Sequence, residues 1–124
     1  MKKKDDLFNN LFVFDMANNH MGDIEHGIKI IRELHRVTKD FDFSFSIKFQ
    51  YRELSTFIHP AYQNSYDFKY VKRFQETKLN DDDLFRLKQE ADNLGFISMC
   101  TPFDEDSVDK IVKFDFDIIK VASC

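Results

Sequence analysis

Short apolar runs alternate along this chain with longer segments in which apolar residues recur at helical spacing. Four of the runs are predicted strands, and the three periodic segments between them have the start and stop signals of helices. Strands that alternate with helices form βαβ units, whose strands pair in parallel through right-handed crossovers. The sequence therefore predicts an α/β fold, a partial (β/α)8 TIM barrel with its first four strands and three helices.

The second predicted strand has the clearest pattern. Its apolar side chains alternate strictly, at Phe43, Phe45, Ile47 and Phe49. Alternate side chains point to opposite faces of a strand, so polar residues share the other face, namely Ser44, Ser46, Lys48 and Gln50. This polar face could line a polar cavity, although alternation alone favours solvent. The other strands are predicted at Leu11 to Phe14 (buried on both faces), Phe96 to Thr101, and Asp117 to Ser123.

Each predicted helix begins at a residue that can cap it. Asp23 caps the first, with an inward stripe of Ile24, Ile28, Ile31 and Leu34. Asn80 or Asp81 caps the second and Gly95 ends it, with an inward stripe of Leu84, Leu87, Ala91 and Leu94. Asp104 or Asp106 caps the third, with inward residues Val108, Ile111 and Val112. Three helices are expected to cover the sheet.

The interval between the second and third strands is longer than a single crossover helix needs. Its excess is residues 51–78, a stretch of aromatic, polar and charged residues that follows the carboxyl end of the second strand. Ligands of parallel α/β folds bind at that end of the sheet. We therefore interpret residues 51–78 as an insertion that forms a lid or a substrate loop, in preference to a decorative surface loop.

Charge and hydropathy exclude two classes of partner. The net charge is −4, with 18 basic and 22 acidic residues, so no overall positive field attracts nucleic acid. No apolar run approaches the roughly 20 residues that span a bilayer. The basic run Lys2 to Lys4 is followed by two aspartates and not by the apolar stretch of a signal peptide. A cytoplasmic location is expected.

Polar residues occupy the carboxyl ends of all four predicted strands. In strand order they are Asp15, then Lys48 and Gln50, then Thr101, then Lys120 and Ser123. These ends converge on one mouth in a (β/α) barrel. Two lysines with two hydroxyls suit a small substrate with phosphate and carboxylate groups, and Asp15 could position a sugar hydroxyl or move a proton.

No local metal or nucleotide motif accompanies these residues. The four histidines lack the spacing of a metal site, at His20, His26, His35 and His59. Three glycines in all provide no glycine-rich phosphate loop. Cys100 and Cys124 lie in separate apolar runs, which is typical of reduced thiols and not of a disulfide frame.

Four blocks of sequence resemble the N-acetylneuraminate (sialic acid) synthase family. Residues 14–23 (FDMANNHMGD) are similar to its first strand and loop, and residues 47–50 (IKFQ) to its K-F-Q strand. Residues 100–104 (CTPFD) are similar to its S-T-P-F-D block, and residues 119–123 (IKVAS) to its K-I-A-S block. The blocks occur in the family's order and extend over nearly the whole chain from Leu11 onward.

The resemblance implies a reaction and roles for these residues. The family condenses phosphoenolpyruvate with N-acetylmannosamine or a related amino sugar and releases phosphate. By resemblance Lys48, Thr101, Lys120 and Ser123 hold phosphoenolpyruvate, and Asp15 and Gln50 contact the sugar. Asn19 and His20 are the further substrate-binding candidates. Asp15 stands where most members have glutamate, and Cys124 where many have glycine.

The resemblance also implies features beyond this sequence. The family has a (β/α)8 barrel, a small antifreeze-like domain and a homodimeric assembly, and it uses a divalent metal, Mn²⁺ or Mg²⁺, whose ligands lie outside this chain. We therefore expect residues 1–10 to be an N-terminal tail and residues 11–124 to be the N-terminal half of a truncated TIM-barrel synthase domain, inactive alone. Two alternatives stay open, namely another phosphoenolpyruvate-dependent sugar-acid synthase of the same superfamily and a non-catalytic half-barrel that binds sugar or phosphate.

Overall fold

The structure, a computed structural model, describes residues 6–123. Four parallel strands form one sheet in the order β1-β2-β3-β4. Their bounds are β1 Leu11–Ala17, β2 Ser44–Tyr51, β3 Ile97–Pro102 and β4 Ile118–Ile119. The consecutive order and parallel pairing are those of a barrel's first strands, so the predicted topology is confirmed.

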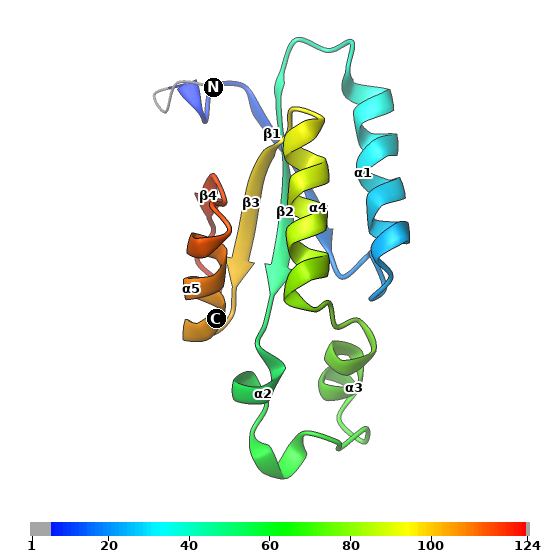
Figure 1. Cartoon of the computed structure of the whole chain (residues 1–124), viewed down its shortest axis with the longest axis vertical. Coiled ribbons are helices and arrows are strands. Elements are labelled where there is room, and N and C mark those ends of the chain that lie inside the picture. Colours follow the sequence, from blue (N-terminus) through cyan, green and yellow to red (C-terminus); the bar gives the residue numbers. More distant parts are fainter. Residues whose placement is uncertain (1–5, 124) are drawn as a thin grey trace.

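Three helices connect the strands and cover one face of the sheet (Figure 1). They are α1 Ile24–Thr38, α4 Asp81–Asn93 and α5 Glu105–Lys113. The predicted insertion contains more secondary structure than expected, with short helices α2 Leu54–Phe57, η2 Pro60–Tyr62 and α3 Lys69–Glu76. Figure 1 shows these elements beyond the arrowheads of β2 and β3. The three predicted helices between the strands are thus confirmed, and the insertion adds short helices that the sequence patterns do not predict.

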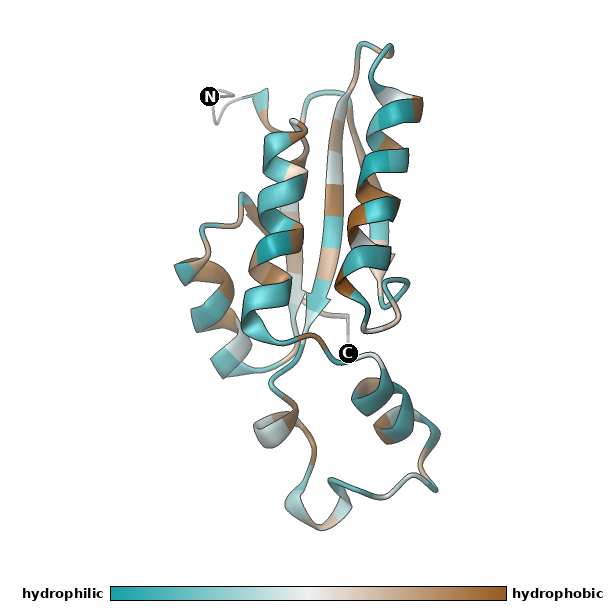
Figure 2. Cartoon of the chain, turned by 45° about the vertical axis from the view of Figure 1, so that its right-hand side comes forward, coloured by the Kyte–Doolittle hydropathy of each residue, from teal (hydrophilic) through white to brown (hydrophobic). Residues whose placement is uncertain are grey.

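The core lies between the sheet and the helices. Figure 2 shows the apolar stripes of α1 and α4 turned toward the strands. The most deeply buried side chains come from both layers, with exposed fractions of 0–1% at Ile31, Ile47, Phe49, Leu84 and Leu87. Burial of such side chains is the main favourable term in folding. The predicted inward stripes of the first two helices are therefore confirmed.

The helix caps follow the sequence closely. The Asp23 carboxylate accepts hydrogen bonds from the backbone N–H groups of Glu25 and His26, and Asp104 accepts one from Ser107. Asn80, and not Asp81, caps α4 through the Asp83 N–H. Side chains at these positions satisfy backbone donors that the helix leaves free.

Three burial predictions are wrong. Phe12 and Val13 of β1 are 51% and 43% exposed, because β1 has only β2 beside it among the described residues. Val108 and Val112 are exposed, since α5 buries a narrower stripe, with Ile111 at 0%. Ser46, for which solvent was favoured, is 0% exposed because Val13 and Ile97 flank it on the neighbouring strands.

The fourth strand is shorter than Asp117 to Ser123. Only Ile118–Ile119 pair regularly with β3, although the Lys120 N–H still donates to the Cys100 carbonyl. Asp117 instead accepts hydrogen bonds from the Ser98 backbone and hydroxyl. The side chain of Cys100 is fully buried, and Cys124 lies outside the described residues. No helix among residues 6–123 is long and apolar enough to cross a membrane.

Candidate active site

The predicted site residues lie at the carboxyl ends of the strands, on the face opposite the core. Strand register sets Asp15 beside Lys48 and Gln50 beside Thr101. Residues at one level of adjacent parallel strands point to the same side of the sheet. The backbone bond from Lys120 to Cys100 brings the fourth strand's residues to the same edge. Sequence positions far apart thus form one polar surface.

An ion pair joins the first two strands at this surface. The Lys48 ammonium lies 2.8 Å from the Asp15 carboxylate, with the lysine side chain 19% exposed and the aspartate 49%. The carboxylate fixes the position of the ammonium and still has lone pairs open to solvent. Lys48 is therefore held at the carboxyl ends of the strands, where its ammonium can bind an anion.

A second polar pair lies on the last strand. The Lys120 ammonium donates a hydrogen bond of 3.2 Å to the Ser123 hydroxyl, and both residues are at least partly exposed. Thr101, on the strand between the two lysines, is only 3% exposed. No contact joins the Lys48 pair to the Lys120 pair directly within residues 6–123. The two cations thus lie on the strands on either side of β3, with Lys48 level with Met99 and not with Thr101.

The loop between β1 and α1 holds His20 in a fixed tautomer. His20 is 3% exposed, and its Nδ1 accepts a hydrogen bond of 3.0 Å from the Gly22 N–H. Burial, with a smaller contribution from His26, lowers the pKa of His20 below 6.5. The neutral ring therefore has its hydrogen on Nε2. Asn19 is exposed at the tip of this loop.

His20 should make stability depend on pH. The pKa of His20 is lower in the folded protein than in the unfolded chain, so the unfolded chain takes up the proton first as pH falls below 6.5. The free energy of unfolding therefore decreases as pH falls from 6.5 toward the pKa of His20 in the folded protein. We expect urea unfolding of His20→Gln to vary less between about pH 5 and 6.5 than that of the unchanged protein. Substitution of the exposed His59 by glutamine is the control. Parallel profiles for His20→Gln and the unchanged protein would contradict this assignment.

A small pocket adjoins Gln50, and sequence reasoning missed most of its lining. Residues of the β1–α1 loop, the end of β2 and the insertion enclose about 30 Å³, room for a few small atoms. Its polar lining residues are Asn18, His20, Gln50, Arg52, Thr77 and Lys78. The β2 alternation could have identified Arg52, since Arg52 follows Lys48 and Gln50 at the same two-residue spacing.

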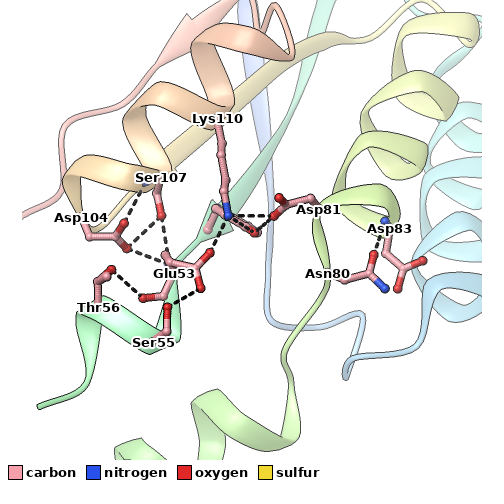
Figure 3. Close-up of polar contacts among 10 residues, drawn as sticks. Glu53, Ser55, Thr56, Asn80, Asp81, Asp83, Asp104, Ser107 and Lys110 are labelled. Carbon is pink, nitrogen blue, oxygen red and sulfur yellow. Dashed lines mark hydrogen bonds and ion pairs between the residues drawn. The ribbon is translucent and has the colours of Figure 1, made fainter. Parts of the chain in front are cut away.

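A network of polar contacts anchors the start of the insertion (Figure 3). The Lys110 ammonium contacts the carboxylates of Glu53 and of Asp81, the latter at 3.1 Å, and Tyr51 donates its hydroxyl hydrogen to Asp81. The Glu53 N–H donates to Asp104 at 2.8 Å and to Ser107. Together these contacts join the end of β2 to α4 and α5, so they position the residues that immediately follow Gln50.

Removal of the Lys110 charge should loosen this junction. We expect Lys110→Met to lower the free energy of unfolding by about 1 kcal/mol, because two partly exposed carboxylates lose their cation. Hydrogen bonds from Lys110 and then Ser55 lower the pKa of Glu53 below 4.5. The stability lost as pH falls below 4.5 should therefore be smaller in the variant. The exposed Lys113→Met, on the same helix, is the matched control, and equal unfolding free energies for the two variants would contradict the role of Lys110.

Comparison with known proteins identifies the family. Residues 44–124, more than half of the chain, match the model of the NeuB family. The chain belongs to the NeuB family. This NeuB match contains Lys48, Gln50, Thr101, Lys120 and Ser123, the strand-end residues from β2 onward.

Solved structures agree with the NeuB fold. A spore coat polysaccharide biosynthesis protein E from Chromobacterium violaceum, described as putative, is 50% identical with a TM-score of 0.90, over 94% of this chain and 34% of that one. An N-acetylneuraminic acid synthetase from Leptospira borgpetersenii, solved with citrate, is 19% identical with a TM-score of 0.72, over 93% and 36%. These NeuB-type TIM-barrel enzymes confirm the partial barrel.

One sequence relative shows how much of a NeuB protein this chain represents. An uncharacterized protein of Methanocaldococcus jannaschii is 30% identical over 105 residues, which is 85% of this chain and 28% of the relative. The chain thus spans about a third of the length of the proteins it matches.

Proposed function

We propose that this chain forms the phosphoenolpyruvate-binding wall of an enzyme that condenses phosphoenolpyruvate with N-acetylmannosamine or a related N-acetylated amino sugar and releases phosphate. The observation behind the proposal is the pair of lysines, Lys48 and Lys120, on the two strands that lie on either side of β3, whose buried Thr101 ends the same polar surface. A substrate with a carboxylate and a phosphate on the same carbon matches two separated cations with hydroxyls near them.

Each residue has a chemical role in this proposal. Lys48 and Lys120 neutralise the carboxylate and phosphate, while the hydroxyls of Thr101 and Ser123 donate hydrogen bonds to their oxygens. The Asp15 carboxylate, 2.8 Å from the Lys48 ammonium, keeps that ammonium from swinging into solvent. Its free lone pairs and the Gln50 amide are available to hydroxyls of the sugar, as are Asn19 and His20 in the neighbouring loop.

The proposed reaction balances without any redox partner. The methylene carbon of phosphoenolpyruvate uses the double-bond electrons to form a bond to the aldehyde carbon of the open-chain sugar, whose oxygen takes up a proton. The remaining oxocarbenium carbon accepts water, which loses a proton. The new hydroxyl on that carbon then gives up its proton and forms the carbonyl as the bond to the phosphate oxygen breaks. Inorganic phosphate leaves with the electron pair of that bond and takes up the proton, and a 2-keto acid remains. Fixed cations lower the cost of bringing the anionic substrate together with the sugar.

The described residues do not fit a metal centre. No three side chains of His, Cys, Asp or Glu within residues 6–123 converge as ligands. His20 uses its Nδ1 for the Gly22 N–H, and Asp15 is paired with Lys48. The expected Mn²⁺ or Mg²⁺ therefore stays a prediction about residues outside this chain. A cytoplasmic, homodimeric enzyme remains part of the proposal.

A substrate panel tests the proposal on the complete gene product. Phosphate release from phosphoenolpyruvate should require an N-acetylated amino sugar, supplied neutral or as an acidic derivative, in buffer with Mn²⁺. Phosphate release with aldose phosphates that lack an N-acyl group, but with none of the amino sugars, would support the alternative of another phosphoenolpyruvate-dependent synthase of the superfamily. Binding of phosphoenolpyruvate without turnover on any sugar would support a non-catalytic half-barrel.

A further inference from the structure

The pocket beside Gln50 has one wall that the proposed reaction does not use. Arg52 forms this wall, at the first position after β2. Its guanidinium carbon lies 3.8 Å from the ring centroid of Phe103 and 4.3 Å from that of Phe74. These two rings lie within the range for cation–π stacking and hold the guanidinium in place. Arg52 is thus a cation pre-positioned at the pocket.

The hydrogen-bonding capacity of Arg52 is only partly used. One Nη donates to the Gln50 side-chain oxygen at 3.2 Å. Its Nε is buried and has no hydrogen-bond partner among the described residues. A buried donor without an acceptor costs about 1–3 kcal/mol, so such a group usually indicates a missing partner.

The guanidinium of Arg52 also has no ion-pair partner among the described residues. No carboxylate lies within 4 Å of its nitrogens in the described part of the chain, and none of the residues that line the pocket is acidic. The Asp104 carboxylate, which acts on Arg52 through its field, already accepts hydrogen bonds from Glu53 and Ser107. A second cation, Lys78, lines the same pocket. The pocket therefore has a positive charge that nothing in it neutralises.

The neighbouring polar groups also present donors. The Gln50 oxygen is occupied by Arg52, so its amide NH₂ is the group left for a ligand. His20 uses Nδ1 as an acceptor, so its remaining nitrogen, Nε2, has the hydrogen. A ligand that satisfies these groups must supply several acceptor oxygens and a negative charge.

We propose that this pocket binds a carboxylate or phosphate group of the acceptor sugar, with Arg52 as the residue that recognises it. The inference rests on the proposed function, because Gln50 joins the pocket to the sugar side of that site. It narrows the acceptor from amino sugars in general to acidic ones. Arg52 then acts as a specificity-determining residue, while Lys48 and Lys120 receive phosphoenolpyruvate.

Equilibrium binding to the complete gene product tests the inference. Three probes are titrated by calorimetry in the presence of phosphoenolpyruvate, namely N-acetylmannosamine, its 6-phosphate and the corresponding uronic acid. At least one acidic probe should bind about 10- to 100-fold more tightly than the neutral sugar, the range expected for charge-assisted hydrogen bonds. Whichever acidic probe has the advantage identifies the group as phosphate or carboxylate.

Variants assign the preference to Arg52. Arg52→Met should remove the advantage of the acidic probe and leave binding of the neutral sugar, which also shows that the variant is folded. Lys69→Met removes an exposed cation from the same insertion and should leave the preference unchanged. Arg52→Lys should keep part of it, because the charge stays while the Nε donor is lost.

Three results would overturn the inference. The first is equal affinity for neutral and acidic sugars in the unchanged protein, and the second is an equal loss of affinity for both in Arg52→Met. The third is a loss of phosphoenolpyruvate affinity in Arg52→Met, since the anion would then belong to that substrate. If phosphoenolpyruvate binds, its binding depends on Lys48 and no acidic sugar is preferred, this inference fails and the proposed function stands. If phosphoenolpyruvate does not bind, the proposed function itself fails.

Discussion

Replacement of Lys48 by methionine is expected to raise the Kd for phosphoenolpyruvate about 10- to 100-fold, the value of one charge-assisted hydrogen-bonded contact to an anion. Methionine keeps an unbranched stem of similar length, so the buried part of the side chain still packs. The Asp15 carboxylate then loses the cation that lies 2.8 Å from it, and its own negative charge repels the substrate. Calorimetric titration with phosphoenolpyruvate measures the change.

A matched substitution separates this contact from general electrostatics. Lys29 lies exposed on α1, on the helix-covered side of the sheet, and Lys29→Met removes the same charge away from the strand ends. It should leave the Kd for phosphoenolpyruvate within about twofold, since exposed charges beyond about 10 Å are screened. An unchanged Kd in Lys48→Met would remove Lys48 from the site.

Gly22→Ala is expected to have the largest effect on stability, about 2–4 kcal/mol, from two sources. Gly22 has a φ of +73°, which an L-residue adopts only at a cost. A Cβ there would also lie 3.0 Å from the Glu76 carbonyl oxygen and 3.4 Å from that of Lys78. Because these atoms belong to the backbone, the β1–α1 loop and the insertion would have to move apart. The Gly22 N–H also bonds His20, so the pocket should be disturbed too.

Gly95→Ala is the control for the first of these sources. Gly95 has a similar φ of +83°, but a Cβ there would have nothing within 4 Å. It should cost only about 1 kcal/mol, the conformational part. Urea unfolding of both variants measures the difference. Equal costs would show that the contact between the loop and the insertion contributes nothing.

The barrel-like part of the fold could be predicted from local patterns. Alternation in Phe43, Phe45, Ile47 and Phe49 specifies β2, and caps such as Asp23 mark the helix starts, because these features act within a few residues. The site residues could be located as well, since parallel strands bring their carboxyl ends to one edge. Asp15 and Lys48 are neighbours for that reason alone.

Long-range contacts could not be predicted in the same way. Whether Ser46 is exposed to solvent depends on its pairing with Val13 and Ile97, which lie on other strands. The stacking of Arg52 on Phe74 and Phe103 joins segments from the insertion and from the end of β3. Sequence periodicity extended past Gln50 could place Arg52 on the polar face of β2, but it has no information on the two rings that hold the guanidinium. For that reason the sequence alone predicts a lid or a substrate loop for this segment and assigns Arg52 no role.

In the proposed function, these strand ends serve a condensation of phosphoenolpyruvate with an amino sugar. The decisive experiment uses phosphoenolpyruvate labelled with carbon-13 at the methylene carbon, incubated with the complete gene product, Mn²⁺ and the preferred N-acetylated amino sugar. The label should appear in a CH₂ group bonded to a former sugar carbon, with one phosphate released per label transferred. Label found only in the methyl group of pyruvate would show hydrolysis without carbon–carbon bond formation and would contradict the proposed function.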